Sequence, residues 1–250
     1  MTPKPRGYVI YRGPSLLDGR PIVAVAITKS RNSKTANMVQ TYIIRADIDP
    51  RDASRTGEDF SICGTCPHRG IASPNKATGL ADRRSCYVVM GQGPLQVYKS
   101  LVAGKYPDAT KPLEIVPHGK GRMVRLGTYG DPAAVPSYVW KWLVSEAAGH
   151  TAYSHQATTQ GAAFDPQLYM RSADSLSEAA FAWGKGQRTF RIIGDQREVM
   201  QGREILCPAS EEAGRKTTCV KCGLCGGASV KAKSIAIVAH GAGAGLIGAA

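Results

Sequence analysis

The sequence predicts an α/β fold in which parallel strands alternate with helices, arranged as one (β/α) barrel-like domain over residues 1–240. Two observations lead to this prediction. After Arg122, β-rich runs alternate with segments of helical periodicity, a pattern typical of parallel sheets. The chain has 250 residues, 43% of them hydrophobic, which suffices for one large core. A wholly disordered basic protein is therefore excluded.

The N-terminal part of the chain indicates strands separated by turns. β-branched and aromatic residues predict strands at 8–11, 22–27 and 39–45. Residues 47–58 are charged and predict a loop. Residues 60–90 and 207–227 are cysteine-rich, contain many turn-forming residues, and are expected as insertions in the domain. Residues 241–250 predict a flexible tail.

In the second half of the chain, predicted strands alternate with predicted helices. Strands are predicted at 123–126, 150–155, 168–171, 189–193, 204–207 and 235–239, and helices at 135–148 and 176–183. In parallel α/β folds the active site lies beyond the carboxyl ends of the strands. Polar residues directly after a strand are therefore the first candidates for a site.

A cysteine group near the C-terminus is the strongest local signal. Cys219, Cys222 and Cys225 are separated by two-residue gaps, a spacing that lets three thiolates bind one ion. Cys207 or His240 can supply the fourth ligand of a closed tetrahedral zinc site. The spacing also matches a bacterial ferredoxin-type 4Fe-4S pattern, although the Cys-Pro pair here precedes the triplet. We expect zinc, with an iron–sulfur cluster as the alternative.

A second cysteine group predicts a weaker metal site. Cys63, Cys66 and His68 form a C-x2-C-x-H pattern, and Cys86 follows twenty residues after Cys66. These residues can bind zinc as a Cys3His site. They are equally compatible with buried thiols and a solvated histidine, or with joining the C-terminal cysteines around one cluster.

Several polar side chains follow the predicted strands. The candidate catalytic residues are Asp131, His155 and Asp174. Candidate substrate-binding residues are Tyr129, Ser154, Gln156 and Ser172. Taken singly, Asp131 and Asp174 also fit the ordinary role of a helix N-cap, because each precedes a helical segment.

The formal charge of +13 is concentrated beside the second cysteine group. Residues 61–130 contain ten Lys and Arg against three Asp and Glu, which gives +7. The side chains expected to meet a phosphate backbone are Arg69, Lys76, Arg83, Arg84, Lys99 and Lys105. The alternative is a solvated basic surface without a partner.

Two resemblances bear on function. Ile62-Cys63-Gly64-Thr65-Cys66-Pro67-His68-Arg69, then Ser85-Cys86-Tyr87, Gly130-Asp131 and the late cysteines resemble a family of uncharacterised cysteine-rich phage proteins over residues 60–240, which carries no chemistry. Cys207-Pro208-Ala209-Ser210, the cysteine triplet and His240 are similar in order to the zinc site of the tRNA-guanine transglycosylases and their DNA-modifying relatives, over about the last forty residues. That family has a (β/α) barrel and an aspartate nucleophile directly before its C-x-x-P segment, where this chain has Leu206.

The second resemblance implies a transglycosylase that exchanges guanine for a 7-deazaguanine base in double-stranded DNA. Asp131 or Asp174 would attack the sugar C1′, and the other carboxylate would transfer the proton. The target base would leave the helix stack to be reached. The alternatives are a non-enzymatic zinc-containing DNA- or RNA-binding phage protein and an iron–sulfur enzyme.

The chain carries no signal for a membrane location. It lacks an apolar run of the length that a spanning helix needs, and its first residues lack an apolar signal-peptide core. We therefore expect a cytoplasmic protein, in the host cytoplasm if it is phage-encoded, with no membrane partner.

Overall fold

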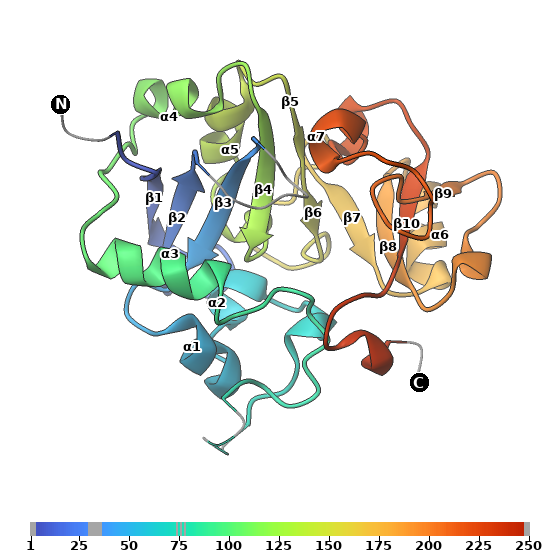
Figure 1. The fold of residues 1–250 in the computed structure, drawn as a ribbon, viewed down its shortest axis with the longest axis horizontal. Coiled ribbons are helices and arrows are strands. Elements are labelled where there is room, and N and C mark those ends of the chain that lie inside the picture. The colour runs from blue at the N-terminus through green and yellow to red at the C-terminus, as the bar shows by residue number, and fades with distance from the viewer. Residues whose placement is uncertain (1–3, 30–36, 74, 76, 78, 248–250) are drawn as a thin grey trace.

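The computed structural model describes residues 4–29, 37–73, 75, 77 and 79–247, and its strands form two five-stranded sheets (Figure 1). The first sheet has the order β1 (Gly7–Pro14), β2 (Pro21–Ile27), β3 (Val39–Ile44), β4 (Met123–Tyr129) and β5 (Gly149–Thr151). The second has the order β6 (Tyr153–Ser154), β7 (Met170–Ala173), β8 (Thr189–Ile193), β10 (Ser234–Val238) and β9 (Glu204–Leu206).

Strand direction changes across the first sheet. β1, β2 and β3 are antiparallel neighbours, whereas β3, β4 and β5 are parallel. All neighbours in the second sheet are parallel. The prediction of parallel strands alternating with helices is therefore confirmed for the second half of the chain, and the N-terminal strands form an antiparallel addition.

The two sheets meet at a single residue, Ala152, which lies between β5 and β6. Its N–H donates to the carbonyl oxygen of Cys225 at 2.9 Å, and its carbonyl oxygen accepts from the N–H of Met170 at 3.0 Å. The sheets therefore lie side by side, with β1 and β9 toward opposite ends of the molecule (Figure 1). A closed barrel is not shown, because within the described chain these two strands are sheet edges.

Helices and 3-10 turns connect and cover the strands. The helices are α1 (Pro50–Thr56), α2 (Phe60–Cys63), α3 (Gly93–Val102), α4 (Pro112–Gly119), α5 (Ser137–Val144), α6 (Leu176–Gly184) and α7 (Cys219–Cys222). The 3-10 turns are η1 (Pro67–Arg69), η3 (Pro132–Ala134), η4 (Gln196–Glu198), η5 (Gly227–Ser229) and η6 (Ala244–Leu246). The turn η6 places part of the expected tail in regular structure.

Helix α1 corrects the prediction of a loop at 47–58. The Asp49 side chain accepts from the N–H of Arg51, Pro50 occupies the first turn, and Gly57 ends the helix with a φ of 81°. These are ordinary start and stop signals of a helix. The segment was predicted as a loop because of its high charge.

Other boundaries also differ from the prediction. The helix expected at 135–148 is the shorter α5, preceded by the turn η3. The strand expected at 150–155 is divided at Ala152 into β5 and β6.

The larger core packs against the first sheet. It joins buried residues of β1 to β4 with Val97 and Leu101 of α3 and with Trp140 and Leu143 of α5. A smaller cluster around Met170, Cys225 and Ile235 belongs to the second sheet. One cysteine of the C-terminal group is thus part of that core.

Candidate functional site

A cavity of about 700 Å³ lies on the sheets and collects most of the candidate residues. We call it the central cavity. Its wall includes side chains of β3, β4, β6, β8 and β10, the start of α3, and the segments around Cys66, Cys86 and Cys222. All seven cysteines line it. The volume lies within the range of ligand-binding pockets.

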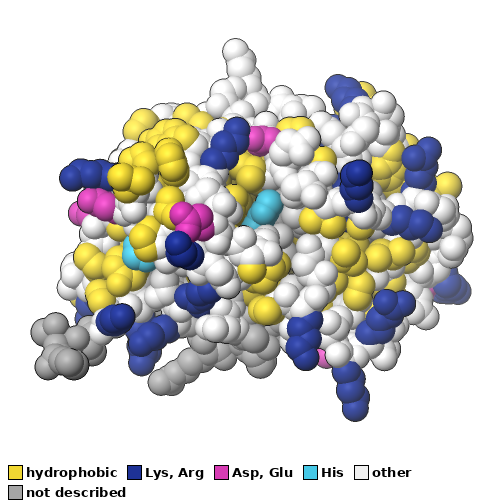
Figure 2. Space-filling view, turned by 90° about the horizontal axis from the view of Figure 1, so that it is seen from above, with side chains coloured by type: hydrophobic (Ala, Val, Ile, Leu, Met, Phe, Trp, Pro, Cys, Tyr) yellow, Lys and Arg dark blue, Asp and Glu magenta, His cyan; other side chains and the backbone are white. Residues whose placement is uncertain are grey.

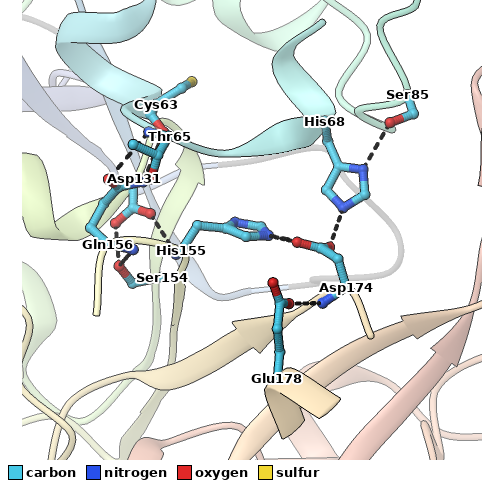
Figure 3. Close-up of polar contacts among 10 residues, drawn as sticks. All are labelled: Cys63, Thr65, His68, Ser85, Asp131, Ser154, His155, Gln156, Asp174 and Glu178. Atoms are coloured by element: carbon cyan, nitrogen blue, oxygen red, sulfur yellow. Dashed lines mark hydrogen bonds and ion pairs between the residues drawn. The ribbon is translucent and has the colours of Figure 1, made fainter. Parts of the chain in front are cut away.

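Asp131 organises the polar residues at the carboxyl end of β4 (Figure 3). Its Oδ1 accepts from Ser154 Oγ at 2.7 Å and from the N–H of Ala133 at 3.0 Å, and its Oδ2 accepts from the N–H of His155 at 2.9 Å. Burial raises the pKa of Asp131, and these hydrogen bonds oppose the shift. The carboxylate therefore fixes the backbone of His155 at the end of β6.

His155 points to Asp174 at the end of β7, and His68 reaches the same carboxylate from η1 (Figure 3). The distances to Asp174 are 3.2 Å from His155 Nε2 to Oδ2 and 2.7 Å from His68 Nε2 to Oδ1. The other ring nitrogen of His68 bonds to Ser85 Oγ at 2.8 Å. Figure 3 shows both rings directed at Asp174 from different elements.

The charges of this group stabilise one another. Burial raises the pKa of Asp174, but hydrogen bonds and charge from both histidines lower it well below its usual value. For His155, burial opposes protonation, whereas interaction with Cys66 and Asp174 raises the pKa well above its usual value. An ionised carboxylate beside a protonated imidazole is therefore the stable state near neutral pH.

The three-cysteine group, Cys63, Cys66 and Cys86, lies next to His155. Burial raises the pKa of the Cys63 thiol, and interactions with the other two cysteines add to this shift. Burial also raises the pKa of Cys86, whose thiol interacts with Cys66 and with His155. His155, which directly follows β6, therefore lies with the predicted set of Cys63, Cys66, His68 and Cys86.

The four-cysteine group, Cys207, Cys219, Cys222 and Cys225, occupies another part of the cavity wall. Burial raises the pKa of Cys225 to about 12, and interactions with the other three cysteines contribute. The structure thus brings the four predicted cysteines together. His240, the other ligand candidate, is exposed and packs on the ring of Tyr87 at 5.5 Å between centroids.

The donor atoms of the candidate site differ in how closely they are grouped. Among the residues that the structure describes, only His68, His155 and Asp174 form a group of three whose donor atoms all lie within 4.8 Å of one another. Sulfurs bound to one tetrahedral zinc ion lie about 3.8 Å apart, given a Zn–S bond of about 2.3 Å. No three sulfurs of either cysteine group meet the 4.8 Å limit within the described residues.

The predicted substrate-binding residues divide into two pairs. Tyr129 and Ser172 line the central cavity. Ser154 is buried and bonds to Asp131. Gln156 is fully buried, and its amide donates to the carbonyl oxygen of Cys63 at 3.0 Å.

The predicted phosphate-binding side chains have different surroundings. Arg69 donates to Asp59, Arg84 donates to the carbonyl oxygen of Cys86 at 2.8 Å, and both line the central cavity. Arg83, Lys99 and Lys105 are exposed, and Lys76 lies outside the described residues. On the face shown in Figure 2, Lys and Arg side chains are spread among neutral and hydrophobic ones.

The cavity wall also includes residues that the sequence analysis does not identify as site residues, among them Gln40, Tyr87 and Arg125. Arg125 is the third residue of β4 and lies on the cavity side of the sheet. An arginine inside a strand with buried neighbours Val124 and Leu126 is the signal that was available.

A scan of family models and searches of curated proteins and of solved structures find no significant match to this chain. Within the described part of the chain, no helix has both the length and the apolar character needed to cross a membrane.

Proposed function

We propose that the protein is an iron–sulfur enzyme with a reactive centre at the three-cysteine group and a second centre at the four-cysteine group. The observation that carries this proposal is that seven cysteines line one cavity as two separate groups, three beside His155 and four around Cys222. Thiolates are the ligands that iron–sulfur clusters require.

The three-cysteine group suits the reactive centre because its ligand set is incomplete. A 4Fe-4S cluster takes four ligands, so three cysteines leave one iron for His155 or for a substrate in the cavity. Such a cluster supplies an electron or a Lewis-acidic iron when bound. The chain's own contribution is the Asp174 carboxylate with the His155 imidazole, whose raised pKa lets it hold a proton beside the carboxylate, while His68 bonds to the same carboxylate.

The four-cysteine group suits a closed centre because it offers four thiols and is part of the packed core. Cys225 is only 8% exposed and contacts the cluster of Met170 and Ile235. Its carbonyl oxygen also joins the two sheets at Ala152. A centre in this place holds the C-terminal loop on the sheet, as structural metals do.

Metal analysis of anaerobically purified protein tests the proposal. We expect about eight irons and eight sulfides per chain, since each 4Fe-4S cluster holds four of each. The Cys66→Ser and Cys222→Ser variants should each reduce the iron content by about half. Zinc at one or two ions per chain without iron contradicts the proposal and favours the zinc-containing DNA- or RNA-binding protein.

Base exchange in DNA is the second candidate function. It is favoured by the position of Asp174, an ionised carboxylate beside a cavity lined by aromatic rings and by Ser172. In that reaction Asp174 would be the nucleophile that attacks the sugar C1′, and Asp131 would position His155. The 7-deazaguanine base would enter the central cavity, with Arg83, Lys99 and Lys105 near the DNA backbone.

An exchange assay separates the two candidates. Labelled guanine or a 7-deazaguanine should be incorporated into double-stranded DNA by the protein and not by Asp174→Ala. Absence of incorporation with both bases, or full incorporation by Asp174→Ala, removes this second candidate. A protein that only binds DNA retains its salt-dependent affinity in the same variant.

A further inference from the structure

We propose that Arg125 binds the anionic group, a phosphate or a carboxylate, of a small ring-containing substrate in the central cavity. The inference deepens the proposed function, on which it rests, because it names the class of molecule that meets the reactive centre. Three neighbouring strands of the first sheet, β3, β4 and β5, each contribute one polar residue to a row across the sheet.

The register of the strands defines this row. Arg125 of β4 is paired with Gln40 of β3 on one side and with Thr151 of β5 on the other. Side chains of paired residues point to the same face of a sheet, and all three line the central cavity. The two residues of this row on β4 and β5, Arg125 and Thr151, are polar side chains on a largely buried sheet, where polar atoms need polar partners.

Arg125 has no carboxylate partner among the residues that the structure describes. Its Nη2 donates to the hydroxyl of Tyr87 at 2.7 Å, and its guanidinium lies 5.5 Å from the ring centroid of Tyr153. Its buried Nε has no hydrogen-bond partner. A guanidinium with free donors in a cavity is suited to bidentate recognition of a phosphate or carboxylate.

Two further buried polar atoms point to the same conclusion. Thr151 is 2% exposed and Tyr129 is 4% exposed, and neither side-chain hydroxyl has a hydrogen-bond partner within the described structure. Buried hydroxyls are normally satisfied, so unsatisfied ones in a cavity wall indicate a ligand that supplies the partner. Both residues line the central cavity together with Arg125.

The remaining wall favours an organic anion over an inorganic one. Tyr42, Tyr153 and Phe190 line the cavity, and the last two rings pack at 4.0 Å between centroids. Such walls accommodate a planar ring, and about 700 Å³ is far more than a phosphate ion fills. The ligand class is therefore a ring system that carries one anionic group, as in a nucleoside monophosphate.

The competing role for Arg125 is that of a counter-ion. Cys219 and Cys225 interact electrostatically with its guanidinium, so a cluster at the four-cysteine group would also lie near this charge. In that case the loss of Arg125 would change the cluster and not the binding of an organic anion. The two roles differ in what they predict for a substituted arginine.

Calorimetric titration of the anaerobically purified protein with guanosine 5′-monophosphate, guanosine and inorganic phosphate tests the proposal. We expect the monophosphate to bind more tightly than the other two probes. Arg125→Gln should weaken its binding about 10- to 100-fold, the value of charge-assisted hydrogen bonds, while leaving guanosine binding unchanged. Arg125→Lys should retain part of the affinity. Arg12→Gln, which alters an exposed arginine of β1 paired with Asp108, is the matched control.

Iron content and unfolding midpoint are measured on every variant. If Arg125→Gln binds the monophosphate as the unmodified protein does, or if neither guanosine 5′-monophosphate nor phosphate binds, the assignment is wrong. Loss of iron in Arg125→Gln with unchanged nucleotide affinity assigns the counter-ion role. A protein that contains no iron but shows the expected binding pattern removes the proposed function and leaves the anion site standing.

Discussion

The two cysteine groups differ in what surrounds them. The three-cysteine group lies at the carboxyl ends of β4, β6 and β7, where Asp131, His155 and Asp174 connect it to a charged network. The four-cysteine group lies on a loop that holds the short helix α7 and packs on apolar residues of the second sheet. In the proposed function, the network of Asp131, His155 and Asp174 suits a centre that exchanges protons with a substrate. The packing of Cys225 on Met170 and Ile235 suits a centre that holds the chain, although Arg125 also lies near its thiols.

Replacing one cysteine of each group by serine gives the largest expected difference in the free energy of unfolding. We expect Cys222→Ser to lower the free energy of unfolding by about 3 kcal/mol or more, since the proposed structural metal would contribute directly to folding. Cys66→Ser should cost about 1 kcal/mol, because the neighbouring network remains. Urea unfolding of the loaded proteins measures both values, and equal losses would remove the distinction between the two groups.

Asp131→Asn examines the polar network on the side of the three-cysteine group. An amide keeps one acceptor but turns an N–H group toward one of the three donors that the carboxylate now satisfies. We expect a loss of about 2 kcal/mol in unfolding free energy. Asp108→Asn, at an exposed ion pair with Arg12, should change it by less than about 0.5 kcal/mol. An equally small effect at Asp131 would show that the network is not holding His155.

The raised pKa of Cys225 predicts a pH dependence for the metal-free protein. Thiols ionise near pH 8.5 in the unfolded chain, whereas Cys225 keeps its proton in the fold up to a pKa of about 12. Between these values the folded state binds more protons, so the unfolding free energy falls as pH rises, by at most about 1.4 kcal/mol per pH unit. Urea unfolding with reductant and chelator from pH 7 to 10 measures the slope, and Cys225→Ser should reduce it. The same slope in the unmodified protein and in Cys225→Ser would show that the raised pKa of Cys225 is not the cause of the pH dependence.

Thr65→Val gives the smallest expected effect. Thr65 Oγ1 bonds to Gln156 Oε1 at 3.2 Å in a partly exposed place beside the three-cysteine group. We expect a loss of about 0.5–1 kcal/mol and unchanged iron content. A drop in iron would show that this loop, and not only the Asp131 network, sets the geometry of the thiols.

Local patterns were sufficient for much of the fold. The strand at Thr189–Ile193 has the predicted bounds, because its β-branched run is flanked by clear turn residues. Helices α3 and α4 were not predicted, since each is short, has a proline in its first turn and lies in a segment with many turn signals. The division of one strand at Ala152 has no local signal, as it arises from pairing with Cys225 and Met170.

The candidate site was also predictable only in part, because some of its contacts join residues that are far apart in the sequence. The rule that sites follow strand ends indicated Asp131, His155 and Asp174, and the structure brings His155 together with both carboxylates. The pairing of His68 with Asp174 spans 106 residues and depends on how the segment after α2 folds back. Arg125 was overlooked because its strand predicts burial, and only strand register shows that it faces a cavity.

The seam at Ala152 has a consequence for the order in which the molecule assembles. The hairpin strands β1 and β2 pair within a short stretch of chain, whereas the bond from Ala152 to Cys225 closes a loop of 73 residues. Because closing a long loop is slower than forming a hairpin, we expect the antiparallel pairs of β1, β2 and β3 to form first. The pairing of β3 with β4, which joins Val39 to Val124, and the seam at Ala152 should form later. In the proposed function, metal insertion at Cys225 would accompany the closing of this seam, so a chain synthesised without metal would accumulate with its N-terminal hairpins formed and its seam open.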